Sequence, residues 1–378
     1  MNYKTIEYKE LSVRVQLSVF DEKGVNEYHV LIENYDTALD TETQYRHIGQ
    51  ALSAVQNTLP ANATLVLKRY FVSDAVNHAR LLPKEEKVAI SIVQQPPLNG
   101  SKVAVWAYLV CGAIMHPNGE NAVIAERPAY KHLFNTQLHN SSNKEFTQTE
   151  KIFQTYSEEL AKRRLSLKDH ALRTWIYVQG VDTHYAGMVK ARRLYFDEQG
   201  LTEQTHYLAS TGIEGKYLHP ETTVFMDAYA VEGIVPEQIT YLKGSTHLSP
   251  TREYGVTFER ATAVDYGDRR HVFVSGTASI DHKGQVVFPL DVDKQTERTL
   301  ENIRVLLAEG GCEMKDVAQL IVYLRDTADY NRVSAFIAAH CPGIPAVIVW
   351  APVCRPAWMV EMECIAVKAV ENRNFAAF

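Results

Sequence analysis

Residues 359–367 read Met-Val-Glu-Met-Glu-Cys-Ile-Ala-Val, an alternation that predicts a β-strand near the C-terminus. Side chains of a strand alternate between two faces, so Glu361 and Glu363 lie on one face and Val360 and Met362 on the other. A carboxyl group among buried neighbours must be paired with a cation or stay protonated. A protonated carboxyl can serve as a general acid, whereas two glutamates on a solvent-facing edge strand have no such role. The spacing alone leaves both interpretations open.

The residues before this strand predict a complete α+β unit. Apolar side chains at helical spacing indicate its two helices, which end at Gly310-Gly311 and Pro342-Gly343. We expect both helices to pack on one face of a mixed sheet. The expected elements, in order, are a strand over 271–274, a hairpin at 281–284, a helix over 293–309, a strand over 317–324, a helix over 329–340, and strands over 347–350 and 359–367.

Two earlier parts of the chain repeat the central order of this unit. The expected elements are helices over 149–164 and 185–196 with strands over 172–178 and 224–231, then a fainter copy with a helix over 44–58 and strands over 64–72 and 102–110. Residues 115–144 are rich in Asn, His and Pro and predict loops with short strands at most. We therefore predict three units, over 1–112 (degenerate), 113–243 and 244–378, each with two helices on one face of a mixed sheet. Their sheets would form a pseudo-threefold, barrel-like core with clefts between units.

Composition excludes several classes of function. The chain has 378 residues, 46% of them hydrophobic and 22% charged, with a net charge of -6, so no basic field would attract nucleic acid or an anionic membrane. The charged N-terminus without an apolar run predicts no signal peptide, and we expect a cytoplasmic protein. Five cysteines without CxxC spacing and scattered histidines without HExxH predict no disulfide framework and no metal site. No glycine-rich nucleotide loop is present, and we expect no cofactor.

The third unit resembles the Rid family of reactive-intermediate deaminases, also called YjgF or endoribonuclease L-PSP. The segments that match are Ser275-Gly276-Thr277, 295–306, 317–326 and 360–367. The resemblance implies that the predicted units are Rid/YjgF-like, or chorismate mutase-like, in fold. Rid proteins form trimers with ligand clefts between subunits, so the resemblance also implies a monomeric pseudo-trimer or a homo-oligomer with clefts between units.

From residue 115 to residue 370 the chain further resembles the chorismatases. The motifs that match are Arg173-Thr174-Trp175-Ile176-Tyr177, the helix with Arg192-Arg193, Ala209-Ser210-Thr211-Gly212-Ile213, Phe258-Glu259-Arg260-Ala261, Ser275-Gly276-Thr277-Ala278-Ser279-Ile280, and Val353-Cys354-Arg355 to Glu361. The resemblance implies hydrolysis of the enolpyruvyl ether of chorismate to pyruvate and a dihydroxycyclohexadiene carboxylate or hydroxybenzoate. Two segments depart from the family pattern, namely Asp281-His282-Lys283-Gly284 and Tyr254-Gly255.

Glu361 is the candidate catalytic acid. An enol ether is cleaved by protonating its terminal methylene carbon, which needs an acid that keeps its proton at neutral pH, and burial would supply one. The resemblance agrees, because Glu361 matches the glutamate that is catalytic in the family. The resemblance also implies that Cys354 influences which product forms, although a free cysteine is more often an inert buried thiol. Glu363 is expected to be a helper or an ion-pair partner.

A substrate with two carboxylates needs two positive anchors, and the bidentate fork of arginine suits them. The candidates are Arg355, Arg325 and Arg173, each of which could instead form a structural ion pair. Further substrate-binding candidates are Tyr177 and Tyr254, through their hydroxyl groups, and Thr211, Gly276 and Thr277, through backbone N–H groups. The expected partner is therefore a small, chorismate-like carboxylate.

Two other functions remain open. A Rid-type enamine or imine deaminase would carry an arginine just after the Pro345-Ala346 turn, where this chain has Val347. A non-catalytic small-molecule-binding homologue would keep the cleft without the chemistry. An endoribonuclease is disfavoured by the negative net charge.

Overall fold

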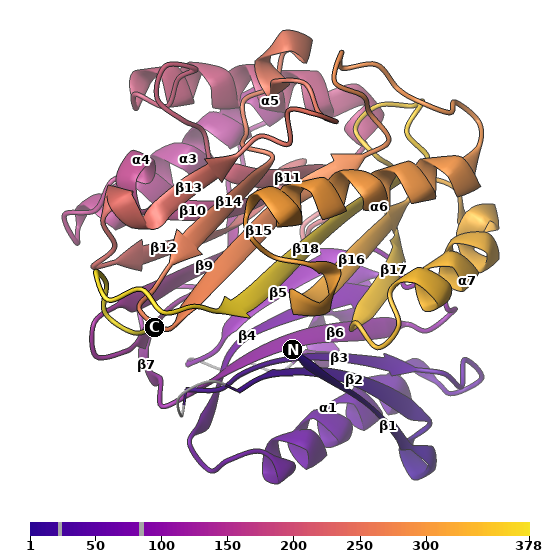
Figure 1. The fold of residues 1–378 in the computed structure, drawn as a ribbon. Coiled ribbons are helices and arrows are strands. Elements are labelled where there is room, and N and C mark those ends of the chain that lie inside the picture. The colour runs from indigo at the N-terminus through magenta and orange to yellow at the C-terminus, as the bar shows by residue number, and fades with distance from the viewer. Residues whose placement is uncertain (22–24, 83–86) are drawn as a thin grey trace.

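A computed structural model describes residues 1–21, 25–82 and 87–378, apart from the side chain of Tyr254. Three six-stranded mixed sheets follow one another along the chain (Figure 1). The first sheet has the order β1-β2-β3-β6-β4-β5 and is covered by α1 and a short α2. Its elements are β1 (Asn2–Tyr8), β2 (Val13–Phe20), β3 (Glu27–Asn34), α1 (Thr41–Thr58), β4 (Ala63–Val72), α2 (Ala75–His78), β5 (Ala89–Gln94) and β6 (Val103–Cys111).

The second and third sheets have the same strand order when both are read from the strand that pairs in parallel. The orders are β11-β10-β12-β9-β8-β7 and β17-β16-β18-β15-β14-β13. The second unit comprises β7 (Ile114–Pro117), β8 (Ala122–Glu126), β9 (Lys131–His139), α3 (Glu145–Ala161), α4 (Leu167–His170), β10 (Ala171–Val178), α5 (Val181–Glu198), β11 (Ala209–Glu214) and β12 (Val224–Glu232). The third comprises β13 (Ile239–Leu242), β14 (Ala261–Asp265), β15 (Arg269–Ala278), α6 (Val292–Glu309), β16 (Val317–Leu324), α7 (Tyr330–His340), β17 (Ala346–Trp350) and β18 (Val360–Ala369). Strand β13 pairs with β14, so the third sheet begins before residue 244.

The three units are structurally equivalent residue by residue at their centres. The strands β4, β10 and β16 each pair in parallel with the next strand, and each carries a register irregularity near its start. The irregularities lie at Leu65/Leu67, Ala171/Arg173 and Val317/Gln319. Counted from them, Phe71, Tyr177 and Tyr323 are equivalent, and so are their antiparallel partners Ala104, Phe225 and Glu361.

The helix-free faces of the sheets pack together, and the helices lie outside. Figure 1 shows α1 below, α3 and α5 at the upper left, and α6 and α7 at the right. One cluster of buried apolar side chains includes Phe71, Tyr177 and Tyr323, whereas separate clusters lie under α1 and under α3 and α5. The predicted α+β fold with three repeated units is confirmed, but strand pairing among the described residues leaves three separate sheets and no closed barrel.

Two expectations about elements are wrong. Residues 115–144 hold β9, a nine-residue strand between β12 and β8, although short strands at most were expected. The cause is that polar side chains of β9 are buried, and Gln137 donates to the Ile92 carbonyl oxygen of the first unit at 2.9 Å, so polarity there does not mean exposure. The first unit has one long helix rather than two, because α2 ends after four residues.

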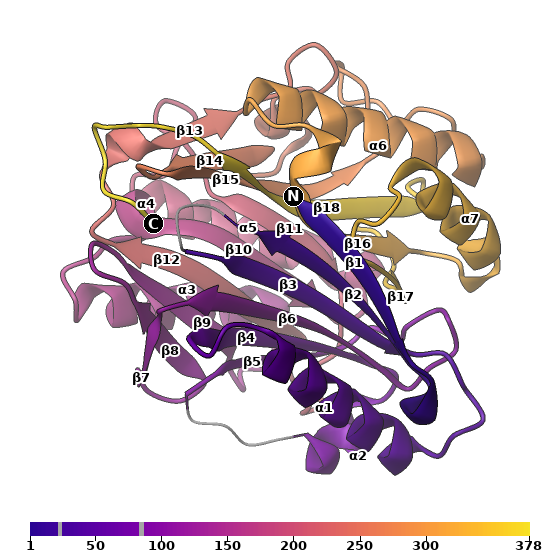
Figure 2. The same ribbon diagram turned by 60° about the horizontal axis from the view of Figure 1, so that its bottom comes forward.

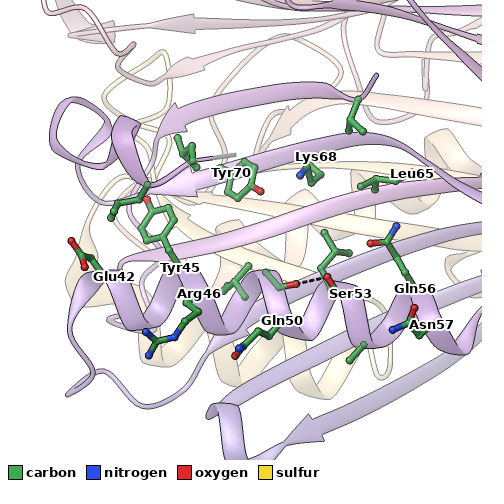
Figure 3. Close-up of a pocket in the computed structure, with 17 residues that line it drawn as sticks. Glu42, Tyr45, Arg46, Gln50, Ser53, Gln56, Asn57, Leu65, Lys68 and Tyr70 are labelled. Carbon is green, nitrogen blue, oxygen red and sulfur yellow. Dashed lines mark hydrogen bonds between the residues drawn. The ribbon is translucent and has the colours of Figure 1, made fainter. Parts of the chain in front are cut away.

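An open groove lies where the first unit lacks a second long helix. It has a volume of about 990 Å³ and runs between α1 and β4, with Tyr45, Lys68 and Tyr70 among its lining residues (Figure 3). The buried Lys68 ammonium lies 5.7 Å from the ring centre of Tyr70, so this lysine covers the sheet much as an apolar side chain would. Within the described ranges, no helix is long and apolar enough to cross a membrane.

Candidate active site between the second and third units

Glu361 lies on β18, an inner strand with β15 on one side and β16 on the other. Its cross-strand partners are Ala278 and Tyr323, and Glu361 itself is 5% exposed. This placement excludes the solvent-facing edge strand that the sequence left open. Both glutamates of the alternating stretch are buried, as the protonated-acid interpretation requires.

Burial keeps a proton on Glu361. Desolvation, helped by the nearby charge of Glu363, raises the pKa of the Glu361 carboxyl to about 8, while Arg173 and Arg260 act in the opposite direction. Among the described residues, no hydrogen bond or ion pair satisfies this carboxyl. At neutral pH Glu361 is therefore mainly a neutral acid that can give a proton to a bound molecule.

Gly276 gives this carboxyl its space. A Cβ atom at position 276 would lie 2.1 Å from Oε1 of Glu361, closer than real contacts allow, and 3.0 Å from Cγ2 of Thr211, which is tighter than most real contacts. The Gly276 N–H donates to Oγ1 of Thr211 across the boundary between the units at 2.8 Å. Gly276, predicted to bind substrate through its backbone N–H, thus donates that N–H to Thr211 and makes room for the acid itself.

The Glu361 cavity, as we call it, lies between the two units and has a volume of about 30 Å³, enough for about two water molecules. Its lining residues are Tyr185 and Arg192 of α5, Ser210 and Gly212 of β11, Val256, Phe258 and Arg260 from the segment before β14, Gly276, Ala278, Ile280, Cys354, Arg355, Trp358 and Glu361. Elements of both units therefore form the wall, and each unit supplies cations.

Three arginines line the Glu361 cavity. Arg260 is fixed by donating to the Ser249 carbonyl oxygen at 2.8 and 3.3 Å, with its guanidinium 5.4 Å from the Phe258 ring. Arg192 is 1% exposed and projects from α5, and the guanidinium of Arg355 lies over the Trp358 ring at 5.3 Å. With Glu361 neutral, this wall carries a concentrated positive charge that suits an anionic ligand.

Cys354 lies beside the acid in the same cavity. Burial and the Glu361 carboxyl raise the pKa of its thiol to about 12, and the hydroxyl of Tyr185 forms a hydrogen bond with it. A thiol with so high a pKa is not a nucleophile at neutral pH. The raised pKa therefore favours a neutral Cys354 thiol, which lines the cavity.

Several predicted substrate-binding residues lie outside the cavity. Arg173 pairs with Glu363 at 2.8 Å, and Glu363 also accepts hydrogen bonds from Trp175 Nε1 at 2.7 Å and from Thr211 Oγ1. Arg69 of the first unit adds a contact of 3.8 Å to the same carboxylate. Glu363 is thus an ion-pair partner that joins all three units, and Arg173 is occupied in the core.

The remaining candidates also have structural partners. Tyr177 donates to Asp227 at 3.3 Å and stacks on Phe225, and Thr277 donates to the Ser275 carbonyl oxygen at 2.9 Å. Arg325 forms a two-pronged pair with Asp182 of α5 at 2.8 and 2.9 Å. The side chain of Tyr254 lies outside the described residues. Of the predicted residues, the structure brings Glu361, Cys354, Arg355 and Gly276 to one cavity.

Tyr185, Arg192 and Arg260 were not predicted as site residues from the sequence. A signal for Arg192 was present, because it falls on the same helical stripe as Tyr185, Met188 and Phe196, where an apolar residue is expected. Arg260 stands in a quoted motif, but only its tertiary placement shows that it faces Glu361. Among the described residues, no cluster of three or more His, Cys, Asp or Glu side chains is arranged to hold a metal ion.

Comparisons with known proteins place this geometry in context. The family model of endoribonuclease L-PSP matches residues 260–368. A RutC family protein of Pyrococcus abyssi is 31% identical over 99 residues, which cover 26% of this chain and 78% of that protein. The 3-aminoacrylate deaminase RutC of Acinetobacter baylyi is 37% identical over 71 residues, 19% of this chain and 56% of that protein.

The comparison with solved structures extends beyond the third unit. The crystal structure of a chorismatase superposes with a TM-score of 0.65 at 19% identity, covering 80% of this chain and 93% of that one. An identity this low shows the fold alone. The chain has the fold of a chorismatase over four fifths of its length, and through its third unit it belongs to the RutC family.

Proposed function

We propose that this protein is a chorismatase-like hydrolase, which cleaves the enolpyruvyl ether of chorismate to pyruvate and a dihydroxycyclohexadiene carboxylate or hydroxybenzoate. The observation that carries the proposal is a buried, protonated Glu361 facing a cavity with three arginines. Chorismate combines a bond that is cleaved by acid with two carboxylates that need cationic partners. The likeness of the fold to a chorismatase supports the same assignment.

The proposed reaction starts with proton transfer from Glu361 to the terminal methylene carbon of the enolpyruvyl group, which leaves an oxocarbenium ion. Water adds to this ion, and the proton it loses returns to Glu361. The resulting hemiketal transfers its hydroxyl proton to the ether oxygen as the C–O bond breaks, giving pyruvate and the dihydroxycyclohexadiene carboxylate. Loss of one water molecule from this diol would give the hydroxybenzoate. Arg260, which already favours the ionised form of Glu361, stabilises the carboxylate while the ion exists.

The size of the Glu361 cavity sets a condition on binding. A volume of about 30 Å³ does not hold a molecule of this size, so lining side chains must move outward when it binds. Arg355 and Phe258 are the best placed to do so, because both are only half-buried and belong to segments outside the sheets. We assign the two carboxylates of the substrate to Arg192, Arg260 and Arg355.

The decisive experiment measures pyruvate from chorismate with purified protein in a coupled assay. We expect pyruvate, and a rate lower by about 10²- to 10⁴-fold for Glu361→Gln, which keeps the shape but cannot donate the proton. Glu313→Gln, at a side chain that is 63% exposed, is the matched control and keeps full activity. Chromatography of the second product then distinguishes the diene from the hydroxybenzoate. Folded protein that yields no pyruvate would refute the proposal.

One observation favours a second candidate, an enamine deaminase. The 3-aminoacrylate deaminase of Acinetobacter baylyi is similar to part of the third unit, and an enamine is also protonated on carbon. Against it, Val347 is fully buried on β17, where the deaminases would need an arginine. Release of ammonia from 3-aminoacrylate, lost in Glu361→Gln, would support the deaminase, and pyruvate from chorismate without that ammonia would support the hydrolase.

A further inference from the structure

A second cavity, of about 520 Å³, opens between the first and third units. On one side are β17 and α7 of the third unit, and on the other are β1, β2 and β3 of the first (Figure 2). Gln16 on β2 ties the two sides together, because its side-chain amide donates to the Ala346 carbonyl oxygen and accepts from the Ala346 N–H, both at 3.2 Å. The cavity is therefore bounded by fixed elements.

This cavity and the Glu361 cavity occupy equivalent places. In β10 the register irregularity ends at Arg173, and the next residue, Thr174, pairs with Ser210. In β16 it ends at Gln319, and the next residue, Leu320, pairs with Ala346. Ser210 lines the Glu361 cavity and Ala346 lines the second one. The helices that follow the central strands, α5 and α7, also take the same part in each wall.

The carboxyl group is carried by different, neighbouring strands in the two sites. In the third unit Glu361 on β18 pairs with Ala278 on β15. In the first unit the residue equivalent to Glu361 is Ala104 on β6, and its partner on β3 is Glu33. Because cross-strand partners have Cβ atoms about 4.5–5.5 Å apart, Glu33 puts a carboxyl close to the place that Glu361 has in its own cleft. We call the second space the Glu33 cavity.

The charges of the Glu33 cavity differ from those of the Glu361 cavity. Its lining holds Glu7, Arg14 and Glu33, and Arg14 forms a pair with Glu7 at 3.4 Å that is about half exposed on both sides. Among the described residues, Glu33 has no hydrogen bond or ion pair to its carboxyl. One acidic group is thus left over, where the Glu361 cavity has three arginines.

Desolvation raises the pKa of the Glu33 carboxyl to about 7, with Arg14 acting in the opposite direction. A cation placed beside Glu33 would return it to the ionised form and release a proton. The facing wall is largely apolar, with Ile337, Ile344 and Ile348 from the third unit. A ligand that fits both walls has one positive end and one apolar end.

We propose that the Glu33 cavity binds a small primary amine with an apolar body, its ammonium group against Glu33 and its body against the isoleucine wall. This site is separate from the Glu361 cavity and does not depend on the reaction proposed there. The Glu361 cavity takes an anion, whereas the equivalent cleft takes a cation.

Titration calorimetry on the full chain near pH 7 tests the proposal with 2-phenylethylamine, and with 2-phenylethanol as the uncharged match. We expect the amine to bind at least about tenfold more tightly than the alcohol, since a desolvated charge pair adds more than about 1.4 kcal/mol. The enthalpy should change with the ionisation enthalpy of the buffer, because protons leave Glu33 when the amine binds.

Three variants sharpen the test. Glu33→Gln should lower the amine affinity at least about tenfold and leave the alcohol unchanged, and Ala338→Trp, on the exposed side of α7, should block both by filling the cavity. Glu361→Gln should bind the amine as the natural chain does, which separates this site from the proposed reaction. Equal affinity for amine and alcohol, unchanged amine binding in Glu33→Gln or Ala338→Trp, or no amine binding at millimolar concentration would overturn the proposal.

Discussion

Glu361 and Glu363 stand two residues apart on one face of one strand, yet their surroundings are opposite. Glu363 has Arg173, Trp175, Thr211 and Arg69 around its two oxygens, all buried. Glu361 faces a cavity, with no such partner for its carboxyl among the described residues. Burial alone therefore does not decide the state of a carboxyl group. A buried carboxyl with cationic partners is part of the core, and one without them keeps its proton.

The largest effect on stability is expected when the cationic partner of Glu363 is removed. Arg173→Met should lower the free energy of unfolding by about 3–5 kcal/mol, because it leaves a buried carboxylate without its main cation. Urea denaturation followed by circular dichroism measures the change. Arg325→Met, whose pair with Asp182 is partly exposed, serves as the matched control and should cost no more than about 1 kcal/mol. Equal losses in both variants would contradict the comparison.

A smaller effect is expected from filling the space beside the Glu361 carboxyl. Gly276→Ala places a methyl group where Oε1 of Glu361 now lies, so the acid must turn away from the cavity. We expect pyruvate formation from chorismate to fall by about 10- to 100-fold, an effect of about 1.4–2.7 kcal/mol on the barrier. The control is Gly49→Ala in α1, where an added Cβ meets nothing within 4 Å. An unchanged rate in Gly276→Ala would show that the position of Glu361 is unimportant.

The smallest expected effect is on stability as a function of pH. The folded chain holds a proton on Glu361 up to about pH 8, while the unfolded chain loses it near 4.5. The folded state therefore binds more protons in that window, so the unfolding free energy contributed by Glu361 falls as pH rises, by at most about 1.4 kcal/mol per pH unit. The difference between the natural chain and Glu361→Gln, in urea denaturation at about pH 6.5 and 7.5, isolates this slope. A difference that grows in the opposite direction would mean that Glu361 is ionised in the fold.

The reaction has its own pH dependence. Because the proposed donor is the protonated carboxyl, the rate of pyruvate formation should decline as pH rises above about 8. The pH profile of kcat/KM measures this limb, and a rate that rises with pH through the same range would mean that Glu361 acts as a base.

The alternation at 359–367 was enough to predict the strand and to place both glutamates on one face. It could not distinguish Glu361 from Glu363, because the partners of Glu363 come from residues 69, 173 and 175, far away in the chain. Arg173 was a substrate-binding candidate for the same reason, since a sequence does not show which carboxylate an arginine meets. The strand β9 was missed because its polar side chains face other units, where polarity serves contacts between sheets.

The equivalent positions Ala104, Phe225 and Glu361 have a consequence for how such a molecule can change. In an assembly of identical copies, every substitution appears in every cleft at once. Here one codon alters one cleft only, so alanine, phenylalanine and glutamate stand at the same place in a single molecule. The Glu361 cavity and the Glu33 cavity can thus each gain or lose a function while the other continues unchanged, and the same independence lets an engineer rebuild one without touching the other.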